Sequence, residues 1–379
     1  MRNTIPYGRQ SITEEDIQAV IDVLRSSWLT TGPKVEEFEE AFSQFIGTKY
    51  AVAVSSGTAA LHASMYALGI GPGDEVIVPA MTFAASANCI VFQRGTPVFA
   101  DVDSETLLID PSVVKKKITP RTKAIIAVDY AGHPCNYDVL REIASEYGLA
   151  LVADCCHALG AKYREKYAGT LADLNVFSFH PVKHITTGEG GMVTTHDSIL
   201  AQRMRSFRNH GITSDHRERH LQGDWFYEMV DLGYNYRLTD FQCALGLSQL
   251  SKLSNWIIER REIARRYSEA FHAVTGIKPL AERPDVCHAY HLYVIRLDVG
   301  NGLNRGELFR ALRERGIGVN VHYIPVHLHP YYRKRFGTAP GLCPVAEQAY
   351  KEILSLPIFP GMGDENLQTV IDAVKQLSS

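Results

Sequence analysis

The spacing of apolar residues predicts two amphipathic helices at the start of the chain. The first carries apolar residues at the spacing of one helix face, at Ile17, Val20, Ile21 and Leu24. Ser11 and Glu14 form a capping-box pattern just before this helix. Thr31-Gly32-Pro33 breaks the chain, and a second helix follows, with apolar residues at Val35, Phe38, Phe42 and Phe45.

The next part of the chain alternates between β-rich runs and helical stretches. The β-rich runs are Tyr50–Val54, Glu75–Val78, Val98–Asp101, Ala124–Asp129, Ala150–Ala153, Val176–Phe179 and Met192–Thr194. Helical stretches such as Ala59–Leu68 and Tyr137–Tyr147 separate most of them, which predicts an α/β fold with a mostly parallel, helix-covered sheet. A Gly-rich loop joins the last two runs, so one antiparallel or irregular strand is expected there.

The C-terminal part has the pattern of a smaller α+β unit. Residues Phe241–Tyr267 are predominantly helical and could link two domains. Strands are expected at Tyr290–Leu297 and Ile317–Tyr323, and helices at Arg305–Arg315 and Asp364–Leu377. We therefore expect a large domain over 12–250 and a small domain over 251–379, with residues 1–11 packing on the small domain.

Composition places the chain among globular proteins and excludes several classes. The 379 residues are 45% apolar and carry a formal net charge of −3, which does not suggest binding to nucleic acid or to a membrane surface. The start, Met1–Gln10, is polar, and the longest apolar run, Ala80–Phe92, is well short of the ~20 residues that span a bilayer. We expect a cytoplasmic protein whose seven cysteines, which include no CxxC pair, are mostly buried thiols.

The segment Ser55–Ala59 follows an expected strand and opens an expected helix. Its small residues allow close approach of a ligand, and the N–H groups of a helix start favour a phosphate. A plain strand-to-helix turn has the same pattern, so this segment alone does not identify a phosphate site.

Asp154 stands at the carboxyl end of a buried run, where open α/β sheets place groups that contact ligands. A carboxylate at such a position needs a cationic or hydrogen-bonding partner, and a protonated pyridine nitrogen would serve. The alternative is a helix cap, since His157 and Gly160 follow closely. Cys155 and Cys156 suggest a metal, but no second cysteine pair stands at zinc spacing.

Lys183 stands in a loop between two β-rich runs, after the aromatic Phe177-Ser178-Phe179-His180 and before the glycines 188, 190 and 191. Enclosure removes solvation from a lysine, lowers its pKa and frees the amine for Schiff-base chemistry. A loop lysine is usually only a solvated charge, but this surrounding pattern makes that alternative weak.

The segment Gly233–Asp240 carries two further candidates. Asn235 could donate to a phosphate, and Arg237 could pair with an anion. The alternative is a turn followed by a helix cap at Thr239 or Asp240.

Taken together, these motifs resemble the DegT/DnrJ/StrS family of nucleotide-sugar aminotransferases, which depend on pyridoxal phosphate (PLP) and have the type I PLP-transferase fold. The resemblance rests on the order of the Ser-Gly-Thr turn, Thr82-Phe83, Asp154 with His157, Ser178 with Lys183, and Gly233–Arg237. It covers nearly the whole chain, from Ile5-Pro6-Tyr7 to residues 322–327, His-Tyr-Ile-Pro-Val-His.

The resemblance implies a role for each matching residue. Lys183 would form a Schiff base with PLP and shuttle a proton, and Asp154 would keep the ring nitrogen protonated. His157 occupies the position that hydrogen-bonds the ring hydroxyl, where many relatives carry glutamine. The remaining cofactor contacts are expected at Gly57, Thr58, Ala59, Phe83, Ser178 and, from a partner subunit of a homodimer, Asn235.

The resemblance also implies the substrates, which are an amino donor, L-glutamate, and a nucleotide-linked keto-sugar. Substrate contacts are expected at Tyr7, Thr30, His180, Arg237, His322 and Tyr323. Candidates for the diphosphate are Arg205, Arg208, His210 and the stretch Arg217–His220, for which a solvated loop is an equal alternative. No metal is expected, although the spacing of His322, His327 and His329 raises that alternative.

Three local matches narrow the expected substrate. Val128–Gly132, Cys156–Gly160 and Phe177–His180 are most similar to family members that aminate a UDP-linked 4-keto-6-deoxy-N-acetylhexosamine in pseudaminic acid biosynthesis. Amination of a dTDP-linked or C3-keto sugar stays open as an alternative. A PLP-dependent sugar dehydratase would replace Lys183 with histidine, and a regulatory protein without turnover would not need an intact Lys183 and Asp154.

Overall fold

The computed structural model describes residues 4–214, 216–298 and 304–378. The helices are α1 (Glu14–Leu24), α2 (Pro33–Ile46), α3 (Gly57–Ala67), α4 (Ala85–Phe92), α5 (Pro111–Lys117), α6 (Tyr137–Tyr147), α7 (Ser198–Phe207), α8 (His216–Gln222), α9 (Asp240–Leu250), α10 (Leu253–Phe271), α11 (Arg305–Glu314), α12 (Pro330–Phe336), α13 (Pro344–Glu352) and α14 (Asp364–Leu377), with 3-10 turns η1 (Tyr130–Gly132) and η3 (Val326–Leu328). The strands are β1 (Tyr50–Val54), β2 (Glu75–Pro79), β3 (Thr96–Ala100), β4 (Thr122–Val128), β5 (Ala150–Asp154), β6 (Lys162–Tyr163), β7 (Lys166–Tyr167), β8 (Leu174–Ser178), β9 (Gly191–Thr195), β10 (Ile277–Pro279), β11 (Val286–Cys287), β12 (Tyr293–Leu297) and β13 (Ile353–Leu356).

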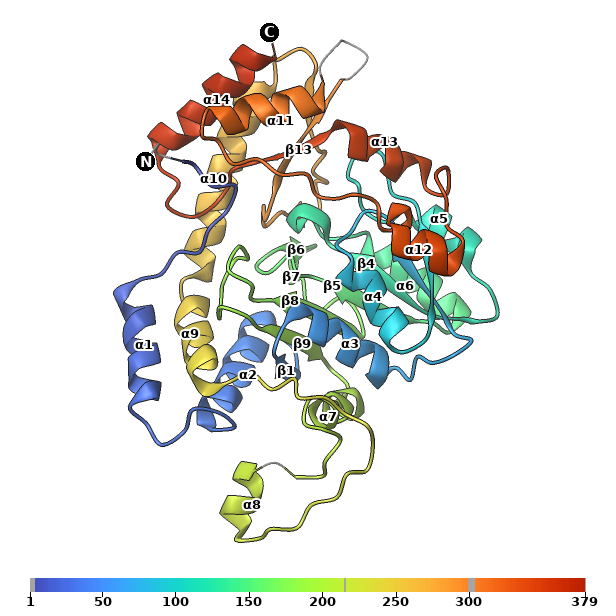
Figure 1. The fold of residues 1–379 in the computed structure, drawn as a ribbon, viewed down its shortest axis with the longest axis vertical. Coiled ribbons are helices and arrows are strands. Elements are labelled where there is room, and N and C mark those ends of the chain that lie inside the picture. Colours follow the sequence, from blue (N-terminus) through green and yellow to red (C-terminus); the bar gives the residue numbers. More distant parts are fainter. Residues whose placement is uncertain (1–3, 215, 299–303, 379) are drawn as a thin grey trace.

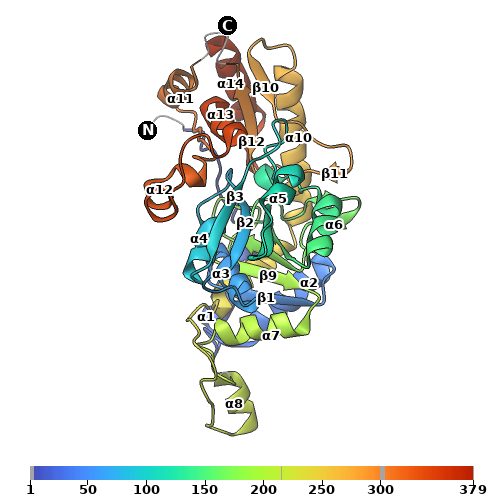
Figure 2. The same ribbon diagram turned by 90° about the vertical axis from the view of Figure 1, so that its right-hand side faces the viewer.

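The central sheet has seven strands in the order β1-β9-β8-β5-β4-β2-β3. The pairs from β8 to β3 are parallel, whereas β9 is antiparallel to both β1 and β8. The predicted antiparallel strand after the Gly-rich loop is therefore confirmed. Helices cover both faces, with α3 and α4 on one side and α6 on the other (Figure 2), which confirms the expected mostly parallel, helix-covered α/β fold.

A smaller antiparallel sheet, β10-β12-β13, lies beside α10, α11 and α14 (Figure 1). Its hydrophobic cluster is separate from that of the central sheet. The helix α10 contributes Trp256 and Ile257 to the central cluster and Tyr267 and Phe271 to the smaller one. Ile5, near the start of the chain, forms a β-bridge with Ile317. The division of the chain at residue 250 stays a prediction.

Two expectations about local structure are wrong. The capping box of α1 is formed by Thr13 and Asp16 instead of Ser11 and Glu14. Asp16 is buried and binds Lys252, Ser248 and Gln249, so tertiary contacts decide which of two similar patterns caps the helix. The expected strand Ile317–Tyr323 is only an extended segment, because its ladder is limited to isolated bridges at Ile317 and Asn320.

A buried carboxylate ties α2 and α7 to the first strand. Glu39 accepts hydrogen bonds from the backbone N–H of Ala53 at 2.9 Å, from Arg205 at 2.8 Å and from Arg208. Burial alone would raise the pKa of Glu39, but the Arg208 and Arg205 guanidinium groups outweigh it and hold the pKa below its ordinary value. Arg205 and Arg208 thus link the end of α7 to α2 and β1.

Residues 216–232, here called the α8 arm, extend away from the rest of the chain beyond α7 (Figures 1 and 2). The arm exposes large apolar side chains, at Leu221, Trp225, Phe226, Tyr227, Met229, Val230 and Leu232. Trp225 is 82% exposed, which is unusual for a residue type that normally buries most of its surface.

The described cysteines form no disulfide, and Cys156 and Cys287 are half-buried while the rest are buried. Within residues 4–214, 216–298 and 304–378, no helix has both the length and the apolar character needed to cross a bilayer.

Candidate active site

The carboxyl ends of the parallel strands bring distant chain segments to one edge of the central sheet. The residue after β1, Ser55, opens the turn into α3, while β5 ends at Asp154 and β8 ends at Ser178. β9 enters from this edge, because its first residue, Gly191, pairs with both Val54 and Ser178. This is the edge where open α/β sheets bind ligands.

The turn from β1 into α3 presents free backbone N–H groups. Ser56 caps the helix by accepting from the N–H of Ala59 at 3.0 Å. The N–H groups of Gly57 and Thr58, at the first two helical positions, have no acceptor in the described part of the chain. These donors and the positive end of the helix form a site suited to a phosphate.

Gly57 lies where three segments meet. A Cβ at this position would lie 2.8 Å from the Cβ of Ser178 and 3.3 Å from the Sγ of Cys156. Only a residue without a side chain lets the helix start approach β8 and the end of β5 this closely. The structure therefore brings together three of the expected cofactor residues, Gly57, Thr58 and Ser178.

Asp154 is buried, and its carboxylate is oriented by two donors. Its Oδ2 accepts from the hydroxyl of Ser86 at 2.7 Å, and its Oδ1 accepts from the N–H of Cys156 at 3.2 Å. Ser86 is held in turn by Thr82 at 2.7 Å. No helix follows Asp154 directly, so the helix-cap alternative is wrong. The carboxylate is available to a cationic partner.

Lys183 lies in the loop that joins β8 to β9. The loop is closed at its base by the N–H of Phe179, which donates to the carbonyl of Gly190 at 2.8 Å. The lysine side chain is half-buried, and within the described residues its amine forms no hydrogen bond or ion pair. Burial lowers the pKa of Lys183, while the nearby Cys156 thiol and Asp154 carboxylate oppose that change. A lowered pKa makes the amine a better nucleophile at neutral pH.

His157 follows Asp154 and is buried beside Lys183. Its Nε2 lies 3.1 Å from the hydroxyl of Tyr323, and its Nδ1 is buried without a hydrogen-bond partner among the described residues. Burial, followed by the charge of Lys183, lowers the pKa of His157 well below its ordinary value. The ring is therefore neutral.

Phe83, expected at the cofactor, forms a connected group of rings with Tyr7, His322 and Tyr323, which are expected at the substrate. The ring of Tyr323 lies 5.9 Å from that of Phe83, which is 59% exposed. His322 lies 5.6 Å from Tyr7 and is held by Ser355 at 2.8 Å through its Nδ1. An exposed phenylalanine at a polar edge is available to stack on a ligand.

Four other expected site residues are exposed or half-buried: His180, Thr30, Asn235 and Arg237. His180 is exposed and its Nδ1 accepts from the N–H of Val182. Thr30 forms a β-bridge with Thr239, which caps α9, and this cap does not involve Asn235 or Arg237. Asn235 is exposed, and Arg237 donates to Asn209 at 2.7 Å.

The expected diphosphate residues separate into two groups. Arg205 and Arg208 are the partners of buried Glu39, so they are not candidates for a substrate, and Arg217 pairs with Glu36 at 2.9 Å. His210, Arg219 and Arg237 instead line a pocket of about 190 Å³, together with Thr31, Asn209 and Ile212. Here we call it the basic pocket.

Sequence reasoning missed Ser86, His184 and His291. The rings of His291 and His157 lie 4.3 Å apart, and those of His291 and His184 lie 5.5 Å apart. His184 adjoins the lysine, but nothing in the spacing of His291, far along the chain, ties it to residue 157. Ser86 is one of the polar residues that interrupt the apolar run 80–92, and such an interruption is the feature of the sequence that could have identified it as a site residue.

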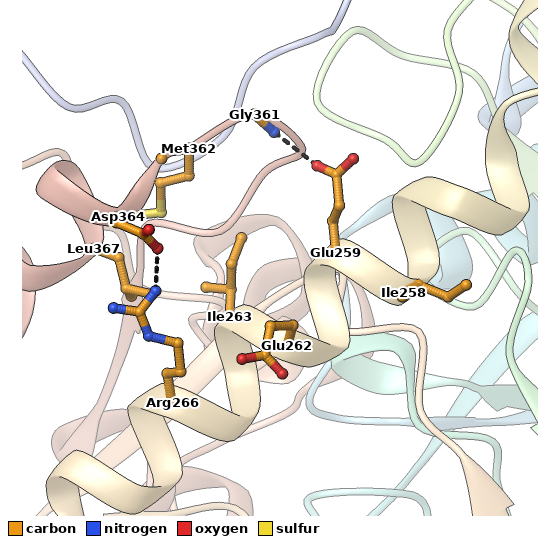
Figure 3. Close-up of a pocket in the computed structure, with 10 residues that line it drawn as sticks. Ile258, Glu259, Glu262, Ile263, Arg266, Gly361, Met362, Asp364 and Leu367 are labelled. Atoms are coloured by element: carbon orange, nitrogen blue, oxygen red, sulfur yellow. Dashed lines mark hydrogen bonds and ion pairs between the residues drawn. The ribbon is translucent and has the colours of Figure 1, made fainter.

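Two other groups of polar residues are not part of this edge. A hollow of about 310 Å³ lies between α10 and the start of α14, where Glu259 accepts from the N–H of Gly361 and Arg266 pairs with Asp364 (Figure 3). These charged groups are therefore already paired within the chain. His327 is buried and bonds to Glu347 at 2.9 Å, and the described residues contain no His, Cys, Asp or Glu group arranged for a metal.

Comparison of the sequence and the fold with known proteins identifies a family with the same organisation. The sequence model of the DegT/DnrJ/EryC1/StrS aminotransferase family matches residues 10–375. SpsC, a spore coat polysaccharide biosynthesis protein of Bacillus subtilis, is 43% identical over 376 residues, which cover 98% of this chain and 97% of SpsC.

Solved structures agree with the family model. PseC of Helicobacter pylori, an aminotransferase involved in the biosynthesis of pseudoaminic acid, superposes with a TM-score of 0.93 at 34% identity over 99% of both chains. Spr1654 of Streptococcus pneumoniae, solved in PLP and PMP (pyridoxamine phosphate) forms, superposes with a TM-score of 0.92 at 34% identity, over 99% of this chain and 98% or more of its own.

The contact at Gly57 generates a prediction about the phosphate cradle. In Gly57→Ala, the added methyl group would push α3 away from Ser178, and overpacking of this kind costs about 1–3 kcal/mol. PLP affinity, measured by absorbance titration of the cofactor-free protein, should fall accordingly. Gly71→Ala is the control, because a Cβ there meets nothing within 4 Å. Equal affinities of the two variants would contradict the cradle.

Proposed function

Because this chain belongs to the DegT/DnrJ/EryC1/StrS aminotransferase family, we propose that it transfers the amino group of L-glutamate to a UDP-linked 4-keto-6-deoxy-N-acetylhexosamine, in pseudaminic acid biosynthesis. The family relation and the fold make it a PLP-dependent sugar aminotransferase. The observation that carries the narrower proposal is the match to PseC along 99% of both chains. The glutamate donor follows from the family, and the UDP-sugar is the finer part of the proposal.

The residues at the sheet edge fit PLP. The phosphate would be held by the free N–H groups of Gly57 and Thr58, with the Ser178 hydroxyl beside them and Ala59 in the same helical turn. Phe83 would cover one face of the ring, and Lys183 offers an amine with no other partner among the described residues. A buried, unpaired Nδ1 on His157 is a further sign that the described chain leaves this region incomplete.

PLP, when bound, supplies an aldehyde for covalent attachment and a ring that accepts electrons from the carbon that loses a proton. The Nζ atom of Lys183 holds that proton and returns it, acting as base and then as acid. Its lowered pKa suits both steps, because an amine that stays fully protonated in solution could not accept a proton.

Asp154 keeps a proton on the ring nitrogen of the cofactor. Ser86 and the N–H of Cys156 orient the carboxylate, and its burial strengthens an interaction with a cation. His157 lies three residues further along the chain and would contact the ring hydroxyl. Because its ring is neutral, it adds no positive charge next to Lys183.

The substrate would enter over the aromatic group formed by Tyr7, Phe83, His322 and Tyr323. A sugar ring has apolar C–H faces that pack on aromatic rings, while its nucleotide diphosphate needs cations. The basic pocket offers such cations at Arg219 and Arg237, beside Thr31 and its neighbour Thr30. His180, exposed at the end of β8, is the remaining polar group of this set.

We propose a homodimer with shared active sites. The α8 arm exposes several large apolar side chains close together in the sequence, and a second copy would cover them. Asn235 follows this arm closely in the sequence and is itself exposed. In such a dimer, Asn235 of one subunit donates to the phosphate in the other.

The alternative substrate is a different nucleotide-linked keto-sugar, for example a dTDP-linked one. SpsC, a spore coat polysaccharide biosynthesis protein, is 43% identical to this chain and PseC is 34% identical, so sequence identity does not single out the PseC acceptor. Both proposals use the same cofactor and the same lysine.

The central experiment follows the cofactor and then the product. The PLP-loaded protein should be yellow, and glutamate should bleach the colour as the amino form accumulates. The bleached protein should then aminate a UDP-linked 4-keto-6-deoxy-N-acetylhexosamine faster than its dTDP-linked counterpart, measured by mass spectrometry of the product. Lys183→Ala should retain no Schiff-base absorbance. Bleaching followed by preference for the dTDP-linked sugar would overturn the UDP-sugar proposal.

Mixing two variants tests the shared sites. Lys183→Ala and Asn235→Ala should each have low activity as separate dimers. If Asn235 serves the partner subunit, mixed dimers contain one site with both residues intact, and random exchange restores roughly a quarter of all sites. Recovery is measured after joint refolding of the two variants. A mixture no more active than its components would contradict the sharing of Asn235.

The basic pocket generates a prediction that separates the two half-reactions. Losing a hydrogen bond to a charged group costs about 1.5–3 kcal/mol, so Arg219→Ala should raise KM for the nucleotide sugar about tenfold or more. Glutamate bleaching should be unchanged, because glutamate carries no diphosphate. Arg217→Ala, on the same helix but paired with Glu36, is the control. An unchanged KM in Arg219→Ala would remove the basic pocket from the substrate site.

A further inference from the structure

His157 is held between two rings that come from distant parts of the chain. His291 lies on one side, with ring centroids 4.3 Å apart. Its segment is fixed to η1 because Ala289 and Leu292 donate to the carbonyls of Gly132 and Ala131. Tyr323 approaches from the segment between α11 and η3, and its hydroxyl lies 3.1 Å from Nε2 of His157. The ring of His157 therefore has a fixed plane.

The hydrogen bond to Tyr323 can be formed in two ways. Burial, with Tyr130 and Asp154 nearby, raises the pKa of Tyr323 well above its ordinary value, so its hydroxyl keeps its proton. His157 is neutral for the reason given above, and it carries one proton on either Nε2 or Nδ1. Either the tyrosine donates to Nε2, or Nε2–H donates to the tyrosine oxygen.

Counting unpaired groups distinguishes the two arrangements. If Nε2–H donates, both the O–H of Tyr323 and the lone pair on Nδ1 of His157 lack a partner in the described chain. If Tyr323 donates, only the N–H on Nδ1 is unpaired. A buried donor or acceptor without a partner is costly, so the second arrangement, which leaves fewer of them, is favoured.

We infer that Tyr323 is a positioning residue whose hydroxyl donates to Nε2 of His157 and thereby fixes the ring proton on Nδ1. The inference goes beyond substrate contact, the role expected for Tyr323, and it rests on the proposed function only for the place of His157 at the cofactor. The partner of one ring nitrogen decides which nitrogen is protonated.

The fixed tautomer protects the proton transfer by Lys183. A neutral imidazole whose Nε2 lone pair is engaged by a phenol O–H, and whose Nδ1 carries a proton, has no free site that could take a proton. His157 then cannot compete for the proton that Nζ of Lys183 moves. Histidine needs such a partner at this position, whereas an amide keeps donor and acceptor on separate atoms.

His184 provides an internal reference of the opposite kind. Its Nε2 lies 3.2 Å from the carbonyl of Ala289, which can only accept, so Nε2 carries the proton and Nδ1 is bare. Burial, with Arg260 nearby, lowers the pKa of His184 well below its ordinary value. Two neutral histidines close to Lys183 are thus expected in different tautomers.

The experiment is long-range ¹H–¹⁵N NMR of the full chain with labelled histidine, recorded with and without PLP. We expect the proton on Nδ1 in His157 and on Nε2 in His184, with His157→Gln and His184→Gln identifying the signals. In Tyr323→Phe, the His157 proton should shift toward Nε2 while His184 stays unchanged. Tyr267→Phe is the matched control, because its buried hydroxyl bonds to the carbonyl of Pro357 at 3.0 Å and removing it leaves His157 alone.

Two results would overturn the inference: a proton on Nε2 of His157 in the unmodified protein, or an unchanged His157 tautomer in Tyr323→Phe. The first measurement decides even if Tyr323→Phe does not fold. Neither NMR measurement depends on glutamate or on the sugar. If the amination assay fails while His157 carries its proton on Nδ1, the result counts against the proposed substrate and leaves the role of Tyr323 unchanged.

Discussion

The site depends on the backbone of β9 lying directly against the turn that follows β1. A Cβ on Gly191 would lie 2.4 Å from the carbonyl oxygen of Ser56, so any side chain there would force the turn away. Gly191 also pairs with Ser178 of β8, which means that this contact sets the distance between the helix start and β8. Because Lys183 lies on the loop between β8 and β9, the same contact also fixes the strand ends between which that loop is held.

Burial, rather than a neighbouring charge, lowers the pKa of Lys183. Lys183 lies near four buried histidines, His157, His184, His291 and His322, and its charge lowers the pKa of each after burial has done so. Since all four rings are neutral, they surround the amine with polar groups that neither stabilise nor repel a full charge. Asp154 is the carboxylate close to the lysine, and Ser86 holds it in one orientation.

The sequence was informative where local pattern decides structure. The bounds of α6 and α14 agree with expectation, and the Gly-rich loop indicated the antiparallel β9. The sequence pattern failed where tertiary contacts determine the structure. Thr13, and not Ser11, caps α1, because Asp16 of the same capping box is held by Lys252. Arg205 and Arg208 looked like anion ligands, but their partner Glu39 lies more than 150 positions away in the chain. His291 could not be found for the same reason, since no local period connects it to His157.

The position of β1 at the edge of the sheet has a consequence for synthesis of the chain. β1 pairs with β9, the last strand of the central sheet to be made, so the ribosome must release every intervening strand before β1 gains its neighbour. Such distant pairing is slow to form and leaves an apolar strand uncovered in the nascent chain. The Ser56 turn therefore gains its contact with Gly191 only after translation has passed the start of β9, so the ligand edge of the sheet is completed late in synthesis.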